Sequence, residues 1–196
     1  MTENVHDVAS LIVTTLGDVD TIRLQKLAYY SQAWHLATYG TALFPDEIQA
    51  WTFGPVVPQL YSAHRGAYGV RTWVRGDPQR LNDQSRRLVD WVLETYGQLT
   101  GEELSRMTHA EAPWLRARAG LDDSERSNEP IDPVVMKDYF SRLRMSPAEA
   151  VSAAVGNARL EGYELSASTA KQLSGIAAGE RSADDVVREV LARYHH

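Results

Sequence analysis

The sequence predicts a mostly α-helical protein: a compact multi-helix domain with at most a short β-hairpin, followed by a small helical C-terminal module. Apolar residues recur at intervals of three and four along most of the chain, as they do on one face of a helix. Capping residues precede many of these stretches, and glycines follow several of them. With 196 residues, 43% apolar and 23% charged, the chain can bury a core.

The first two predicted helices span residues 5–16 and 21–39, and Gly17 and Gly40 end them, the latter in a left-handed cap. Thr21 is the expected N-cap of the second helix. Apolar residues cover two faces of this helix: Leu24, Leu27, Ala28, Ser31, Trp34 and Thr38 on one, and Ile22, Tyr29, Ala33 and Leu36 on the other. A helix apolar on two faces is usually enclosed, so residues 21–39 are predicted to be the buried hub.

The middle of the chain predicts one short strand among further helices. Residues 48–53 read IQAWTF, a β-prone stretch that Gly54 and Pro55 are expected to end. A helix is then expected over residues 57–68, followed by a loop or short hairpin over residues 70–80. The remaining predicted elements are a helix after the cap Asn82 that Gly97 ends, a helix opened by the Thr100–Glu103 capping box, a short helix over 110–120, a solvated loop over 122–130 and a last helix over 132–143.

A second helical start follows directly. Ser146 as N-cap, Pro147 in the first turn and Glu149 three residues after the cap form a capping box. We therefore predict a main domain over residues 1–143 and a helical tail over residues 144–196. About fifty residues bury little core alone, so the tail is expected to dock on the main domain or on a partner.

Composition excludes several classes of function. A formal net charge of −6 argues against a general nucleic-acid binder, although a local basic patch is compatible with it. The absence of cysteine excludes disulfides, thiolate zinc sites and cysteine nucleophiles. The sequence contains no long apolar run that would indicate export or a membrane partner. A cytoplasmic protein is therefore expected.

No catalytic or metal-binding constellation is evident. His35, His64 and His109 with Glu111 could gather around a metal, but no HExxH pair lies on one helix. Carboxylates at helix starts, which are Glu102, Glu103 and Glu111, are expected to serve caps and the macrodipole. We therefore expect no metal, no cofactor and no enzymatic activity.

The stretch QAWTFGPVVPQLY concentrates large aromatic residues and prolines. One interpretation is that Trp51, Phe53 and Tyr61 fill the core beside Trp34 while the prolines fix the turn. The other is that a rigid loop displays aromatic anchors to a protein partner. Both can hold for different residues, and Trp51 is expected in the core.

Four segments, RLQKLAYYSQAWHLATYGTALF, AWTFGPVVPQLY, YGQLTGEELSRMTHAEAPW and VMKDYF, together resemble the Panacea domain of SocA-like and phage-associated GepA-like antitoxins. The resemblance covers residues 5–143. It implies a mostly helical, non-catalytic antitoxin that neutralises a cognate toxin by direct binding. The matching residues, expected as scaffold or partner-facing edge, are Trp34, His35, Trp51, Phe53, Gly54, Pro55, Val56, Val57, Tyr61, His109, Glu111, Pro113 and Trp114.

The tail, from NARLEGYEL onwards, is similar to VbhA-like antitoxins, which inhibit Fic/Doc-type toxins that transfer AMP to protein hydroxyls. Their inhibitory pattern is Ser or Thr, three residues, Glu, then Gly or Asn. Asn157, Glu161 and Gly162 occupy it here, with Asn157 departing from the first position. In that family the glutamate reaches an active-site arginine and disturbs the ATP γ-phosphate.

Local chemistry allows two interpretations of Glu161. A carboxylate in a last helical turn opposes the macrodipole, and Gly162 suits a left-handed helix end. Pairing with Arg159 or Lys171 on a solvated face is the structural alternative, but the resemblance favours inhibition. The leading hypothesis is thus an antitoxin, and the alternatives are an adapter that delivers a toxin to a AAA+ protease, as SocA relatives suggest, or an antitoxin of a non-Fic toxin.

Overall fold

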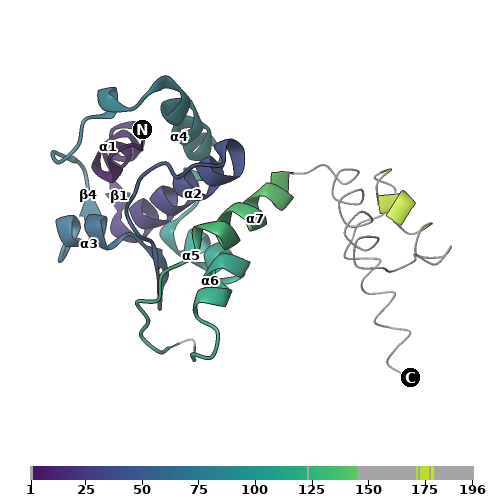
Figure 1. The fold of residues 1–196 in the computed structure, drawn as a ribbon. Helices are drawn as coiled ribbons and strands as arrows, with labels where there is room; N and C mark the ends of the chain where they lie inside the picture. Colours follow the sequence, from purple (N-terminus) through teal and green to yellow (C-terminus); the bar gives the residue numbers. More distant parts are fainter. Residues whose placement is uncertain (1, 123, 145–170, 172, 177, 179–196) are drawn as a thin grey trace. The chain divides into compact units, whose positions relative to one another are not determined.

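The computed structural model describes residues 2–122, 124–144, 171, 173–176 and 178 (Figure 1). The chain divides into two units, residues 1–141 and 142–196. In the second unit the described residues 171 and 173–176 are helical. The predicted capping box at Ser146 and the predicted inhibitory residues Asn157, Glu161 and Gly162 lie outside the described residues. The domain boundary after residue 143 therefore stays a prediction.

The first unit is mostly helical, which confirms the predicted fold class, and its last helix continues three residues past the boundary, to Arg144. Its elements in chain order are α1 (Val5–Leu16), β1 (Val19–Asp20), α2 (Thr21–Tyr39), β2 (Gln49–Trp51), β3 (Gly54–Val56), α3 (Pro58–His64), β4 (Gly69–Val70), the 3₁₀ helix η1 (Pro78–Arg80), α4 (Asp83–Tyr96), α5 (Gly101–His109), α6 (Ala112–Ala117) and α7 (Pro133–Arg144). Each described helix is too short or too polar to cross a membrane.

Two antiparallel strand pairs accompany the helices. The predicted strand is the first half of the hairpin β2–β3, in which Trp51 pairs with Gly54 and Ala50 with Pro55. The prediction was that Gly54 and Pro55 end the strand segment. They instead begin the returning strand β3. The second pair joins β1 to β4 across about fifty residues of sequence and was not predicted.

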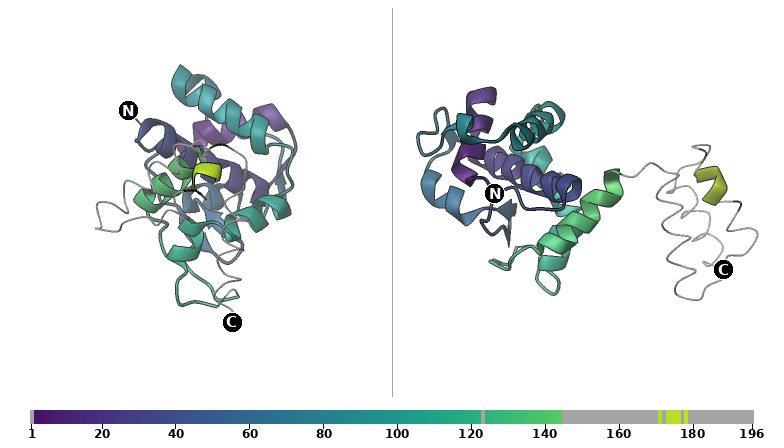
Figure 2. Two further views of the ribbon diagram at one scale, coloured as in Figure 1. Left: turned by 90° about the vertical axis from the view of Figure 1, so that its right-hand side faces the viewer. Right: turned by 45° about the horizontal axis from the view of Figure 1, so that its top comes forward.

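Helix α2 is the hub of this unit (Figure 1). It contacts α1, α3, α4, α5 and β3, and Figure 2 shows from two further sides that other helices enclose it. Every residue from Leu24 to Leu36 is buried, which confirms the predicted hub. Its N-cap is Asp20 rather than Thr21, because the Asp20 carboxylate accepts the Arg23 N–H. Ile22, expected on a buried face, is 45% exposed because it lies in the first turn, before the enclosed stretch.

Enclosure of α2 buries its polar side chains together with its apolar ones. Gln32 shows how they are satisfied: its Oε1 accepts the Leu43 and Phe44 N–H groups at 2.7 and 3.1 Å, and its Nε2 donates to the Phe44 carbonyl at 3.0 Å. An unpaired buried amide costs about 1–3 kcal/mol, so these bonds fix the loop after α2 against the hub.

Glu111 is a second buried polar group tied to α2. Its two carboxylate oxygens accept the hydroxyl groups of Tyr29 and Tyr30 at 3.0 and 2.9 Å. Although Glu111 occupies the N-cap position of α6, its side chain makes no capping hydrogen bond there. The predicted capping role is therefore wrong, because the side chain turns inward to the tyrosines. Burial raises the pKa of Glu111 to about 7, and the two hydroxyl hydrogen bonds oppose that rise.

Most predicted helix ends are confirmed. Asn82 caps α4, Thr100 and Glu103 form the capping box of α5, and Gly40 takes the left-handed conformation with φ of 74°. Helix α3 ends at His64, four residues before the predicted end at residue 68. The chain turns there because the Tyr68 carbonyl accepts the Thr21 N–H, which brings β4 to β1.

Glu111→Gln should abolish one component of the pH dependence of stability. The carboxyl pKa of 4.5 rises to about 7 in the folded protein, so the folded state holds its proton more tightly than the unfolded state. The free energy of unfolding should therefore fall, by about 3 kcal/mol, as pH rises from about 4.5 through 7. The substituted amide keeps the shape of the side chain without ionising, so the variant should lack this fall.

Urea unfolding across this pH range measures the effect. Glu94→Gln, which changes an exposed glutamate on α4, is the matched control and should behave as the parent does. Equal pH slopes for the parent and the Glu111→Gln protein would contradict the assignment.

Candidate functional site

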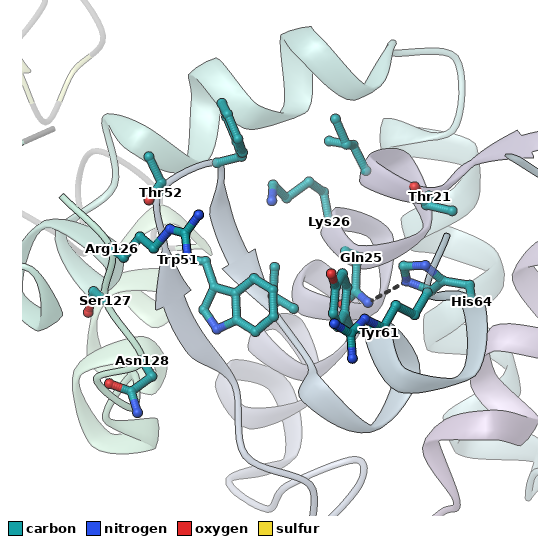
Figure 3. Close-up of a pocket in the computed structure, with 14 residues that line it drawn as sticks. Thr21, Gln25, Lys26, Trp51, Thr52, Tyr61, His64, Arg126, Ser127 and Asn128 are labelled. Carbon is teal, nitrogen blue, oxygen red and sulfur yellow. Dashed lines mark hydrogen bonds between the residues drawn. The ribbon is translucent and has the colours of Figure 1, made fainter. Parts of the chain in front are cut away.

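A pocket of about 780 Å³ opens beside the β2–β3 hairpin (Figure 3). Four segments that are distant in sequence form its wall: the start of α2, the hairpin, α3 with the residue after it, and the loop before α7. The lining residues are Thr21, Ile22, Gln25 and Lys26, then Trp51, Thr52, Phe53 and Val56, then Tyr61, His64 and Arg65, and finally Arg126, Ser127 and Asn128.

Gln25 attaches the hairpin to the hub. Its Oε1 accepts the Val57 N–H at 2.8 Å, which leaves its Nε2 as a donor. That Nε2 lies 2.9 Å from Nε2 of His64 and 3.5 Å from the Val57 carbonyl. Because an amide nitrogen can only donate, His64 accepts through Nε2 and is neutral in this arrangement. Burial lowers the pKa of His64, which is consistent with this state.

Helix α6 holds the other side of the hairpin. The Trp114 indole N–H donates to the Trp51 carbonyl at 3.0 Å, and an Arg118 N–H donates to the Ala50 carbonyl at 3.2 Å. The Arg118 guanidinium lies 5.0 Å from the centre of the Trp114 ring and also donates to the Glu125 carbonyl at 2.8 Å. Arg118 thus fixes both the hairpin and the loop that carries Arg126, and Trp114 fixes the hairpin.

Gly54 lets the hairpin approach the hub closely. Its φ is +96°, and a Cβ there would lie 2.7 Å from Cε of Lys26 and 2.8 Å from Oγ1 of Thr108. Both the backbone conformation and the space therefore require glycine. The Ser105 hydroxyl donates to the Phe53 carbonyl at 2.9 Å, so α5 also supports the turn.

The aromatic residues of the motif separate into core and surface. Trp34 is buried, stacks edge-to-face on Phe140 at 5.2 Å between ring centres and donates to the Tyr96 hydroxyl. Trp51 and Tyr61 are half-buried at the pocket and meet edge-to-face at 4.8 Å.

The expectation that Trp51 lies in the core is therefore wrong, and the interpretation in which Phe53 and Tyr61 also fill the core does not hold. Successive residues of β2 alternate between its faces, so the buried Ala50 places Trp51 on the outer face. Phe53, in the turn between the strands, is 73% exposed.

The motif residues His35, His109 and Pro113 lie away from the pocket and support the scaffold. His35 donates through Nδ1 to the Thr41 carbonyl at 2.7 Å, and His109 stacks on Trp114 at 4.2 Å between ring centres. Pro113 is buried in the first turn of α6. Among the residues that the structure describes, no three His, Asp or Glu side chains are grouped as a metal ion would require. His35, His64 and His109, which were considered as metal ligands, therefore lie in three separate helices.

Lys26 is the pocket residue that sequence reasoning missed. It is 1% exposed, and its Nζ donates to the Pro55 carbonyl at 3.1 Å. Burial lowers its pKa from 10.5 to about 7. Figure 3 shows the side chain reaching from α2 towards the hairpin, with Arg126 on one side of the view and Trp51 and Tyr61 below. The sequence signal that could have identified it is a lysine within the helix that was predicted to be buried.

The charge of the pocket is opposite to that of the chain. Lys26, Arg65 and Arg126 line it, and none of its described lining residues is Asp or Glu. The chain as a whole carries a formal charge of −6. The pocket therefore combines an apolar aromatic wall with a local excess of positive charge.

Comparison with known proteins gives two family matches. Residues 24–115 match the model described as "Antitoxin SocA-like, Panacea domain", and residues 148–193 match the model "Antitoxin VbhA". Antitoxin SocA of Caulobacter vibrioides is 29% identical over 157 residues, which is 71% of this chain and 83% of that protein. No solved structure matches. The first match contains the hairpin, α3 and most of the hub, and the second contains the predicted inhibitory residues.

Gly54→Ala should destabilise the fold more than the same change at Gly66. Both glycines have positive φ, of 96° and 85°, but a Cβ at Gly66 meets nothing within 4 Å. Gly66→Ala should therefore cost only conformational strain, about 1 kcal/mol. Gly54→Ala adds the collisions with Lys26 and Thr108 and should cost about 3 kcal/mol.

Chemical denaturation of the two variants and the parent provides the comparison. Equal costs at the two positions would mean that the hairpin is not in close contact with α2.

Proposed function

We propose that the chain is the antitoxin of a toxin–antitoxin pair and neutralises a cognate toxin by binding it directly. The observation that carries this function is the match of one chain to two antitoxin families, SocA-like Panacea over residues 24–115 and VbhA over residues 148–193. Neutralisation occurs by occlusion of the toxin rather than by a reaction, and it requires no cofactor. A cytoplasmic location follows from a toxin that acts inside the cell.

The pocket supports a protein-binding role. Phe53 is exposed, Trp51 and Tyr61 are half-buried, and aromatic side chains of this kind supply much of the affinity at protein interfaces. A hydrogen bond that Gln25 accepts from the Val57 N–H and one that Trp114 donates to the Trp51 carbonyl hold the hairpin that carries Trp51 and Phe53. A surface that is already ordered loses little conformational entropy on binding, which favours tight association.

The toxin that we favour is a Fic-type AMP transferase inhibited by Glu161. The VbhA match covers Asn157, Glu161 and Gly162, the three positions of the inhibitory pattern. A glutamate carboxylate can form a planar bidentate pair with an arginine guanidinium, and such a pair in the toxin active site would displace the ATP phosphates.

Co-expression with the protein encoded beside this chain's gene tests the antitoxin function. Growth of cells that express the neighbour should stop, and growth should resume when this chain is present. In a titration of the purified proteins, toxin activity should reach its minimum near one equivalent. Full inhibition by a small fraction of an equivalent, or no inhibition at any ratio, would contradict stoichiometric binding.

The amount of toxin in the same cells distinguishes the main alternative. An unchanged amount of inactive toxin supports direct neutralisation. Loss of toxin that depends on a AAA+ protease would instead identify the chain as a proteolytic adapter.

Glu161→Gly should restore AMP transfer by a Fic-type toxin while the complex still forms, because the rest of the interface is unchanged. Gly162→Val should weaken inhibition, since a β-branched residue resists the left-handed conformation that the sequence predicts there. Glu164→Gly makes the same change three residues away and should inhibit as the parent does.

Labelled ATP measures AMP transfer by each co-purified complex. If the Glu161→Gly protein inhibits as well as the parent, Glu161 is only a surface carboxylate. A partner that transfers no nucleotide when released would show that the toxin is of another kind.

A further inference from the structure

The hydrogen bond of Lys26 to the hairpin does not explain why this buried position carries an ionisable side chain. Its ammonium group has three N–H donors, and among the described residues it donates to the Pro55 carbonyl. A buried charge without an opposite charge is costly, and an apolar side chain of similar length would fill the same space without that cost. The hub therefore keeps a lysine where packing alone favours methionine or leucine.

The surroundings of Lys26 indicate what kind of group it meets. Arg65 follows α3 and Arg126 lies in the loop before α7, so three cationic side chains from three segments line one pocket. Both arginines are exposed, whereas Lys26 is buried. Trp51 and Phe53 add an apolar wall at the same pocket. This combination matches a ligand with one anionic group next to an apolar group.

The pocket does not resemble a phosphate or nucleic-acid site. Two backbone amides near the start of α2 already have partners, because Arg23 donates to the Asp20 side chain and Thr21 donates to the Tyr68 carbonyl. A chain of net charge −6 also repels polyanions over its surface as a whole. A carboxylate with a neighbouring apolar side chain, as an acidic peptide segment provides, fits these charges better.

We propose, building on the antitoxin function above, that the pocket receives an acidic segment of the cognate toxin, with a toxin carboxylate on Nζ of Lys26 and an adjacent apolar side chain against Trp51 and Phe53. The toxin carboxylate supplies the counter-charge that the scaffold lacks, and it accepts a hydrogen bond from the Lys26 ammonium. Arg65 and Arg126, at the exposed rim, attract the acidic toxin segment electrostatically and orient it.

Toxin binding should then take up a proton above about pH 7. Burial holds the pKa of Lys26 at about 7, and an incoming carboxylate raises it, so at higher pH the amine must first be protonated. Affinity should fall up to tenfold per pH unit above that value. The other charged and titratable side chains that line the pocket are Tyr61, His64, Arg65 and Arg126, and burial lowers the pKa of His64, away from this range.

Lys26→Met tests the inference in the full-length chain. The variant should melt at the same temperature as the parent or higher, because it removes a buried amine. It should bind the toxin at least tenfold more weakly and lose the pH dependence above about pH 7. Lys137→Met, which changes an exposed lysine on α7, is the matched control and should bind as the parent does. Arg126→Gln, at the exposed rim, should weaken binding severalfold without affecting the core.

A peptide probe makes the result independent of the antitoxin function. Acetyl-Phe-Asp-amide should shift the Trp51 indole NMR signal of the parent but not of the Lys26→Met protein, and acetyl-Phe-Asn-amide should shift neither. Peptide binding without a toxin complex would overturn the antitoxin function and keep the pocket inference. A well-folded Lys26→Met protein that binds the toxin as tightly as the parent, or no preference for the Asp peptide, would overturn the inference.

Discussion

Each buried polar side chain of helix α2 needs a hydrogen-bond partner, and this requirement organises the first unit. Because other elements enclose α2, its glutamines and tyrosines cannot reach water and bond to the segments around it instead. Gln32 holds the loop after α2, Gln25 holds the end of the hairpin, and Tyr29 and Tyr30 hold Glu111. Loops that would otherwise be mobile are thereby fixed by the core of the domain.

The pocket is a direct consequence of this arrangement. The row of polar residues that secures the loops also contains Lys26, and Gly54 allows the hairpin to lie against it. Trp114 and Arg118 hold the same hairpin from the other side. The partner-facing aromatic residues are therefore carried by a frame with little freedom, which suits recognition of a partner by a pre-ordered surface.

Local features of the sequence predicted the helices well, whereas hydrogen bonds between residues distant in sequence could not be predicted from any sequence pattern. Asn82, Thr100 and Gly40 act on backbone groups within a few residues, so their roles were visible in the sequence. The bonds from Gln25 to Val57 and from Lys26 to Pro55 join positions about thirty residues apart. Trp51 was expected in the core because large aromatic residues dominate cores, but the pairing of the hairpin decides its direction and places it on the outer face. Glu111 was misassigned because a buried acid at a helix start looks like a cap.

Hydrogen exchange of the Val57 amide in a Gln25→Leu variant tests most directly whether α2 holds the site. The Gln25 side chain is the acceptor of that N–H, while the Leu43 N–H bonds to Gln32 and serves as an internal reference. We predict that protection falls at Val57 and through the hairpin, at least tenfold, while Leu43 keeps its protection. Unchanged protection at Val57 would show that the hairpin is held without the hub and would contradict this account.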